Sequence, residues 1–68
     1  MKQIIGKDFY RLLTGKGWSL ARIKGSHHIF FKDGVRERIV IPVHGNKTLK
    51  IGLLKAQMKV ADIKESDL

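Results

Sequence analysis

Glycine-containing turns cut this chain into five short apolar segments, which leaves few folds open to it. Gly15 and Gly17 end the first segment, and the pairs Gly25-Ser26 and Asp33-Gly34 separate the next three. An Asp-Gly pair between two apolar runs is a strong signal for a β-hairpin. Segments of this spacing predict an α+β fold of order α-β-β-β-α, with a three-stranded antiparallel sheet and both helices on one of its faces.

The first and last segments have the spacing of amphipathic helices. The first helix is expected over residues 8–16, and the last begins after Asn46 or Thr48, either of which is a suitable N-cap. The residues expected at helical spacing are Phe9, Leu12 and Leu13 in the first helix, and Leu49, Leu53, Leu54, Gln57, Met58 and Ala61 in the second; all but Gln57 are apolar.

The middle segments, residues 18–23, 27–32 and 35–43, have the composition of strands. Because side chains alternate between the two faces of a strand, Trp18 and Leu20 share a face, with Arg22 a candidate for the same face. We expect Trp18 in the core. The expected inward residues of the third strand are Ile39, Ile41 and Val43, and its outward residues are Arg36, Arg38 and Val40.

The middle strand does not show by its pattern which face it buries. His27, Ile29 and Phe31 share one face, and His28, Phe30 and Lys32 share the other. Both sets mix apolar and basic side chains, so alternation alone does not choose between them. Two histidines therefore remain candidates for one site.

The charge and size of the chain limit the classes of partner and the cellular location that we expect for it. Fourteen Lys and Arg against six Asp and Glu give a net charge of +8 on 68 residues, which favours RNA, DNA or an acidic protein as partner. There are no cysteines, so neither disulfides nor a thiolate zinc site hold the core. No long apolar run occurs, and we expect no signal peptide, no membrane span and a cytoplasmic location. A single domain is expected over residues 1–68.

Two histidines follow the Gly25-Ser26 turn, and histidine is the side chain whose ordinary pKa lies nearest to working pH. A histidine fixed beside a glycine turn in a small basic chain indicates proton transfer on a phosphodiester. His27 and His28 point to opposite faces of a strand and do not easily ligate zinc together. The acidic residues are scattered rather than clustered for Mg²⁺, so we expect neither metal nor cofactor. His44 is either a general acid that works with His27 or a loop residue whose ring a backbone carbonyl satisfies, and we favour the loop residue.

Three motifs occur in a specific order along the chain. Gly17-Trp18 follows the first helix, Gly25-Ser26-His27 follows a basic strand, and Val40-Ile41-Pro42-Val43-His44 precedes the last helix. This order resembles that of the HicA toxins, small mRNA interferases with a double-stranded-RNA-binding-like fold, each silenced by a HicB antitoxin. In that family the essential histidine follows Gly-Ser, and the next position varies. The resemblance therefore implies that His27 is catalytic and that His28 is mainly structural.

The chemistry of RNA agrees with this assignment. The 2′-hydroxyl is a nucleophile beside the scissile phosphate, so cleavage needs only a base, cations around the phosphate and an acid for the leaving oxygen. We expect a metal-independent endoribonuclease with His27 as its base. The expected RNA contacts are Arg22, Lys24, Gly25, Ser26, Arg38, Lys47 and Lys50.

Two other functions remain open. The same fold hosts RNA-binding modules without catalysis, and Lys47 and Lys50 also suit a solvated helix face. A subunit that only pairs with a partner protein would use the apolar Ile29 and Phe31 as its contact patch. For the toxin itself the expected partners are mRNA and a HicB-like antitoxin that contacts Ile29 and Phe31, and the free chain is expected to be a monomer.

Overall fold

The computed structural model describes residues 3–68, so Met1 and Lys2 of the expected domain lie outside the described residues. The elements in chain order are α1 (Gly6–Gly15), β1 (Ser19–Lys24), β2 (His27–Phe31), β3 (Ile39–Pro42), α2 (Ile51–Ala61) and a short 3-10 helix, η1 (Glu65–Asp67). The predicted α+β class and the order α-β-β-β-α are confirmed.

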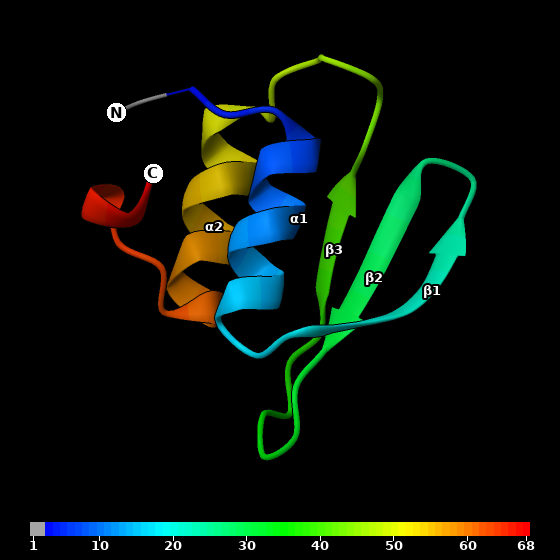
Figure 1. The fold of residues 1–68 in the computed structure, drawn as a ribbon, viewed down its shortest axis with the longest axis vertical. Coiled ribbons are helices and arrows are strands. Elements are labelled where there is room, and N and C mark those ends of the chain that lie inside the picture. Colours follow the sequence, from blue (N-terminus) through cyan, green and yellow to red (C-terminus); the bar gives the residue numbers. More distant parts are fainter. Residues whose placement is uncertain (1–2) are drawn as a thin grey trace.

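The strands form one antiparallel sheet in the order β1-β2-β3, and both helices lie side by side on one side of it (Figure 1). The β1–β2 turn and the loop from β3 to α2 lie at one end of the sheet (Figure 1). The β2–β3 loop lies at the other end. Within residues 3–68 no helix combines the length and the apolar composition needed to cross a lipid bilayer.

The core lies between the helices and the sheet. Phe30 on β2 and Ile39 and Ile41 on β3 are fully buried. The helices add Phe9, Leu13, Leu54, Met58 and Ala61 to the same cluster. These positions recur at helical spacing on α1 and α2 and at alternate positions on β3, which is why one layer of helices covers one face. Trp18 is buried as well, and its expected place in the core is confirmed.

The loop between β2 and β3 begins with the expected turn, but it does not make a tight hairpin. The Lys32 carbonyl accepts the Val35 N–H at 3.1 Å, and of the central pair Asp33-Gly34 only the glycine has a positive φ, of 83°. A positive φ at the second central residue alone is the pattern of a type II turn. The twist of that turn splays the flanking strands instead of pairing them.

Strand pairing therefore resumes late, and β3 is shorter than the expected strand of residues 35–43. Arg36 and Arg38 are exposed as expected, but they lie in the loop before β3 rather than on a strand. Within β3 the expected alternation is confirmed, since Ile39 and Ile41 are buried and Val40 is exposed.

A β-bulge in β1 determines the face on which Arg22 lies. Leu20 is opposed to Phe30 and Arg22 is opposed to Ile29, so Ala21 is an extra residue on β1. An extra residue reverses the alternation of the strand beyond it, and directly opposed residues share a face. Arg22 therefore lies on the open face with Ile29, and the expectation that it shares a face with Leu20 is wrong.

α2 begins at Ile51, later than expected, and neither Asn46 nor Thr48 is its N-cap. Thr48 instead forms a β-bridge with Ile5. The next residue, Leu49, donates its N–H to the backbone carbonyl of residue 4 at 2.8 Å. This extended pairing holds the segment against the start of the chain, so the helix begins only after it.

α1 begins earlier than expected, at Gly6, and ends at Gly15. Gly6 is buried where the helix meets the end of β3, and a Cβ atom on it would lie 2.6 Å from the Pro42 carbonyl oxygen. Only glycine, which has no Cβ, permits such a close backbone approach. The contact fixes the start of α1 at the same end of the sheet as the β1–β2 turn.

Candidate functional site

A two-residue turn joins β1 to β2 and presents His27 at its end. Lys24 and His27 are opposed across the two strands, with only Gly25 and Ser26 between them. Gly25 has a φ of 62°, and glycine at the first central position of a two-residue loop is typical of the type II′ turn. The Ser26 carbonyl accepts the Val43 N–H at 2.9 Å, which ties the turn to the chain just after β3. His27 therefore lies on a turn that is held from two sides.

The strand pairing gathers most of the expected site residues on the open face of the sheet. Opposed residues share a face, and the pairing gives the rows Lys24–His27–Pro42, Arg22–Ile29–Val40 and Ser19–Phe31. Arg38 joins the last row, because its guanidinium carbon lies 5.8 Å from the centre of the Phe31 ring. That distance suits a cation–π contact. The basic side chains, the histidine and the apolar pair thus share one surface.

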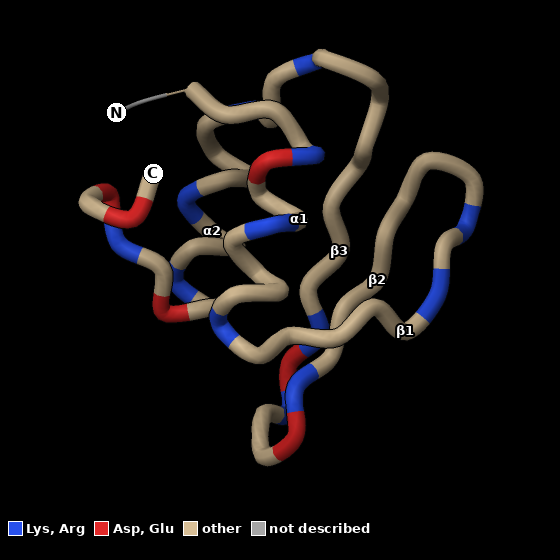
Figure 2. The backbone as a smooth tube through the Cα atoms, viewed as in Figure 1, with Lys and Arg blue, Asp and Glu red and all other residues tan. Residues whose placement is uncertain are grey.

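This open face is basic. The three strands contain Arg22 and Lys24 but no Asp or Glu. Figure 2 shows the acidic residues at the start of α1, in the β2–β3 loop and in the C-terminal segment, away from the β1–β2 turn. The His27 side chain is exposed, so a ligand on this face reaches its imidazole. An anionic ligand would meet positive charge and an accessible histidine at the same end of the sheet.

His28 lies on the opposite face, under α1. Its ring packs edge-on against Tyr10 with the ring centres 5.7 Å apart, and Tyr10 meets Phe30 edge-on at 5.0 Å. The His28 Nδ1 lies 3.2 Å from the Ser26 carbonyl oxygen, so that a protonated Nδ1 donates to it. The expectation that His28 packs toward the helices beside Phe30 is confirmed.

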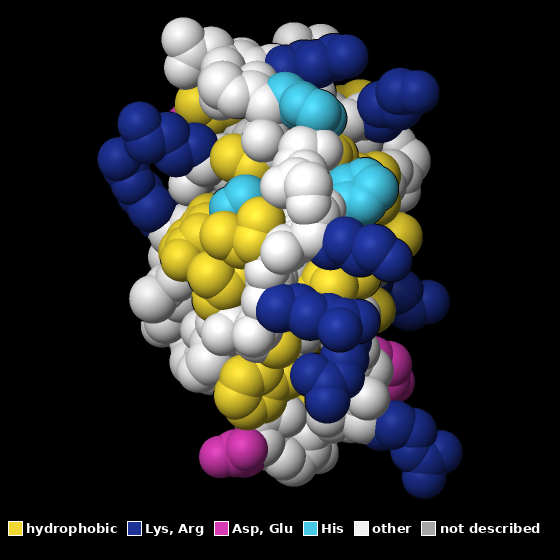
Figure 3. Space-filling model, turned by 90° about the vertical axis from the view of Figure 1, so that its right-hand side faces the viewer, with side chains coloured by type: hydrophobic (Ala, Val, Ile, Leu, Met, Phe, Trp, Pro, Cys, Tyr) yellow, Lys and Arg dark blue, Asp and Glu magenta, His cyan; other side chains and the backbone are white. Residues whose placement is uncertain are grey.

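Lys47 and Lys50 lie away from the strands, in the loop between β3 and α2. Together with His44 they line a pocket of about 280 Å³, whose apolar wall includes Pro42. Pro42 is opposed to His27 across β2 and β3, so the pocket adjoins the same end of the sheet. Figure 3 shows histidine side chains at the surface of the upper part of this side of the molecule, with Lys and Arg side chains grouped beside them.

The histidines do not form a metal-binding cluster. His27 and His28 project from opposite faces of β2, and His44 belongs to the loop after β3. Within residues 3–68 no group of three or more His, Cys, Asp or Glu side chains is placed to hold a metal ion. The arrangement therefore does not support a role for the three histidines as joint ligands of one metal ion.

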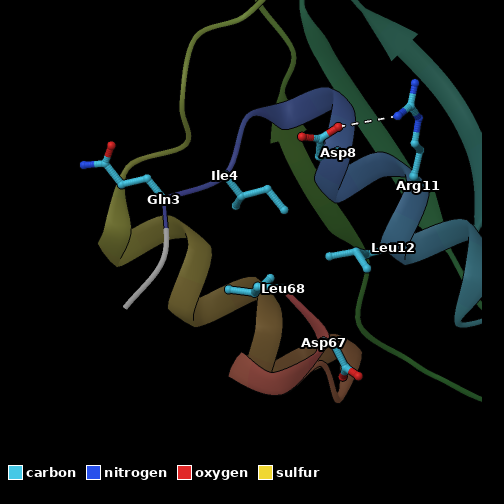
Figure 4. A pocket seen from close by; sticks show the side chains of 7 residues that line it. All are labelled: Gln3, Ile4, Asp8, Arg11, Leu12, Asp67 and Leu68. Atoms are coloured by element: carbon cyan, nitrogen blue, oxygen red, sulfur yellow. Dashed lines mark ion pairs between the residues drawn. The ribbon is translucent and has the colours of Figure 1, made fainter.

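Another pocket, of about 350 Å³, lies between α1 and the C-terminal segment (Figure 4). Ile4, Leu12 and Leu68 supply its apolar surface. Asp8, at its rim, pairs with Arg11 at 3.6 Å. None of the expected site residues lines this pocket.

The same pocket carries a further carboxylate, that of Asp67. The backbone N–H of Lys64 donates to this carboxylate at 2.9 Å. That hydrogen bond, assisted by the charge of Lys16, lowers the pKa of Asp67 below its ordinary value. Asp8 pairs with Arg11, and the Asp67 carboxylate lies 3.5 Å from the Lys16 ammonium, so the cations beside this pocket are already paired. The open face of the sheet is therefore the better candidate site for a polyanion.

Sequence reasoning missed the parts played by Tyr10 and Pro42. Tyr10 contacts both His28 and Phe30, but nothing in the helical pattern distinguishes it from other residues of α1. Pro42 enters the sequence analysis only as part of the Val40–His44 motif, although it is opposed to His27. The alternation of β3, with Ile41 inward, is the signal that would have placed Pro42 on the open face.

The chain matches a known protein family over the region that contains this candidate site. The family model described as HicA toxin of bacterial toxin–antitoxin matches residues 6–63, from the first residue of α1 to just beyond α2. The matched segment contains the whole open face and the pocket beside it. No curated protein matches the chain significantly.

Proposed function

The chain belongs to the HicA family of toxins from bacterial toxin–antitoxin systems, and from this premise we propose that it is an endoribonuclease that cleaves mRNA with His27 as general base. Membership of the family also implies a cognate antitoxin. The observation that carries the proposal is the position of His27, which lies on a braced turn and on an open, basic face.

The reaction uses a nucleophile that RNA itself supplies. Neutral His27 accepts the proton of a 2′-hydroxyl, and the oxygen attacks the adjacent phosphorus. The bond from phosphorus to the 5′-oxygen then breaks, and the leaving oxygen takes up a proton from water or from the imidazolium. The products are a 2′,3′-cyclic phosphate and a free 5′-hydroxyl.

Positive charge around the phosphate stabilises the transition state as negative charge develops on its oxygens. Lys24 is opposed to His27, and Arg22 lies in the next row of the same face. A Cβ atom on Gly25 would meet nothing within 4 Å, so the turn leaves open space for the RNA backbone. We assign Lys24 and Arg22 to the scissile phosphate, the Gly25-Ser26 turn to close backbone approach, and Arg38 to a neighbouring phosphate.

The direct test is cleavage of a short single-stranded mRNA by the purified chain without its antitoxin. We expect products that end in a 2′,3′-cyclic phosphate and a 5′-hydroxyl, identified by mass spectrometry. A matched RNA with 2′-O-methyl groups should resist cleavage because its nucleophile is blocked. The rate should be the same in EDTA.

Three results would contradict this mechanism. If the His27→Ala variant cleaves RNA at the wild-type rate, His27 is not the general base. Loss of cleavage in EDTA would require a metal. Tight binding of RNA by the wild-type chain without any cleavage would favour a non-catalytic RNA-binding module.

We further propose that a HicB-like antitoxin covers the open face and that the free toxin is a monomer in the cytoplasm. The apolar Ile29 and Phe31 lie on this face next to basic side chains. Such a surface combines an apolar anchor with electrostatic steering toward an acidic partner. A protein bound there would block access of RNA to His27.

A further inference from the structure

We propose that the pocket between β3 and α2 binds a nucleotide of the same RNA strand, next to the nucleotide that is cleaved. The pocket is formed by Pro42 at the end of β3, the chain that follows it and the first turn of α2. The inference rests on the proposed ribonuclease function, but it concerns the binding of RNA and not the chemical step.

Backbone contacts hold the walls of this pocket in place. The His44 carbonyl accepts the Lys47 N–H at 2.9 Å, which closes a tight turn. Thr48 is bridged to Ile5, and the Leu49 N–H donates to the carbonyl of residue 4 at 2.8 Å. The volume of about 280 Å³ is close to the lower end of the range for small-ligand sites, about 300 Å³. Because the walls are already ordered, a ligand binds with little loss of chain entropy.

The lining residues match the parts of a nucleotide. Lys47 and Lys50 supply positive charge for a phosphate, and Pro42 and Leu53 supply apolar surface for a base or a ribose. The hydroxyl of Thr48 can donate a hydrogen bond to an oxygen of a ribose or a phosphate. Among the described residues that line the pocket there is no Asp or Glu.

Pro42 connects this pocket to His27. The two residues are opposed across β2 and β3, and neighbouring strands lie only about 4.7–4.9 Å apart. In the proposed path, a strand of RNA with one phosphate at His27 and Lys24 crosses Pro42 and places its next nucleotide in the pocket that Pro42 and Lys47 line. The pocket near the C-terminal segment has no such connection, and the cations beside it, Arg11 and Lys16, are already paired with Asp8 and Asp67.

An acidic segment of the antitoxin is the other occupant that the charge of this pocket would suit. RNA is favoured for two reasons. First, the pocket has both cations and an apolar wall, which match the phosphate and the base or ribose ring of a nucleotide. Second, the pocket adjoins the open face of the sheet, where we place the cleavage reaction. The experiment below separates the two occupants.

The test compares two double variants that change the net charge equally. Lys47→Glu/Lys50→Glu reverses the charge of the pocket. Lys55→Glu/Lys59→Glu reverses two exposed lysines of α2 that do not line it. Both are made in a His27→Ala chain, and circular dichroism verifies that each is folded. The probe is a fluorescent single-stranded RNA with 2′-O-methyl groups throughout, and its affinity is measured by anisotropy at several salt concentrations.

We expect the pocket variant to lose about tenfold more affinity for this RNA than the control variant, because it loses charge-assisted contacts. Its slope of log K against log salt concentration should fall by about 1.4, since each contact with a phosphate of single-stranded RNA contributes about 0.7. Equal losses in the two variants would overturn the proposal.

A second result would overturn it as well. If the pocket variant binds RNA normally but binds the antitoxin more weakly than the control does, the pocket belongs to the protein partner. The probe is not cleavable, so a failure of the His27 chemistry leaves the comparison of affinities intact. Equal losses of affinity, conversely, leave the assignment of His27 untouched.

Discussion

The helix-covered face and the open face of the sheet are built from different kinds of contact. On the covered face Phe30, Ile39 and Ile41 have no exposed surface, and Tyr10 packs edge-on against both Phe30 and His28. On the open face Val40 is 40% exposed and Phe31 is 37% exposed, with basic side chains between the apolar ones. The two faces are separated only by the thickness of one strand.

The difference shows that adjacent residues of the same type in β2 have different roles, one in the stability of the core and the other in the binding surface. Residues on the covered face are held by many neighbours, so changes there act on stability. Residues on the open face have few neighbours, so changes there act on what the surface binds or cleaves. The same substitution made at two adjacent residues, one on each face, therefore tests which face is part of the core. The two variants differ by only one position in the chain.

The largest effect is expected from the histidine pair. His27→Ala should lower the rate of RNA cleavage about 10²–10⁴-fold, because it removes the general base, and should leave the thermal unfolding midpoint unchanged. His28→Ala should lower the midpoint, because it removes the contact with Tyr10 and the hydrogen bond to the Ser26 carbonyl. Cleavage assays and thermal unfolding of both variants provide the measurements.

The reverse outcome would break the comparison between the faces. If His28→Ala abolishes cleavage while its unfolding midpoint stays at the wild-type value, His28 acts in the chemistry. If His27→Ala unfolds the chain, the open face is not the tolerant surface that its exposure indicates.

The next effect is on stability and comes from the phenylalanine pair. Phe30→Ala should lower the free energy of unfolding by about 3–5 kcal/mol, the usual cost of an aromatic ring removed from a core. Phe31→Ala should lower it by less than about 1 kcal/mol, since it loses mainly the contact with Arg38. Urea unfolding measures both, and Phe30→Leu supplies a midpoint if Phe30→Ala is unfolded in water. Equal losses for the two rings would contradict the assignment of faces.

A smaller effect is expected on binding of the antitoxin. Phe31→Asp should weaken the complex by about 2 kcal/mol, or roughly 30-fold, if its ring is a central anchor of the interface. Ile23→Asp is the matched control, because Ile23 is 54% exposed but is opposed to His28 and so lies on the other face. Titration calorimetry with the cognate antitoxin measures both. Full affinity of Phe31→Asp would exclude the open face from the interface.

The order of the elements follows from the sequence because its signals are local. Glycine turns and the alternation of apolar residues act within a few positions, and they predict the type and order of the helices and strands correctly, although not where each one begins and ends. The candidate His27 comes from the same local motif, together with the family resemblance. The match of the HicA family model to residues 6–63 supports the family.

The features that sequence reasoning placed wrongly depend on contacts between distant segments. The face of Arg22 is set by the bulge at Ala21, which exists only in the pairing of β1 with β2. The start of α2 is set by the bridge between Thr48 and Ile5. The pocket beside His27 was not foreseen, because it depends on Pro42 lying opposite that residue. The alternation of β3 predicts the face of Pro42, but no periodic signal in the chain predicts which residues of distant segments pair with one another.

The smallest expected effect is a change in stability on β3, where adjacent residues again lie on the covered face and on the open face. Ile41→Val removes one methylene group from a fully buried side chain, which should cost about 0.5–1.5 kcal/mol and lower the unfolding midpoint by about 2–12 °C in a domain of this size. Val40→Thr keeps the branched shape at an exposed position and should change stability by less than about 0.5 kcal/mol. Differential scanning calorimetry resolves the two. If Val40→Thr costs as much as Ile41→Val, the open face is packed in solution, and a second layer of protein must cover it even without the antitoxin.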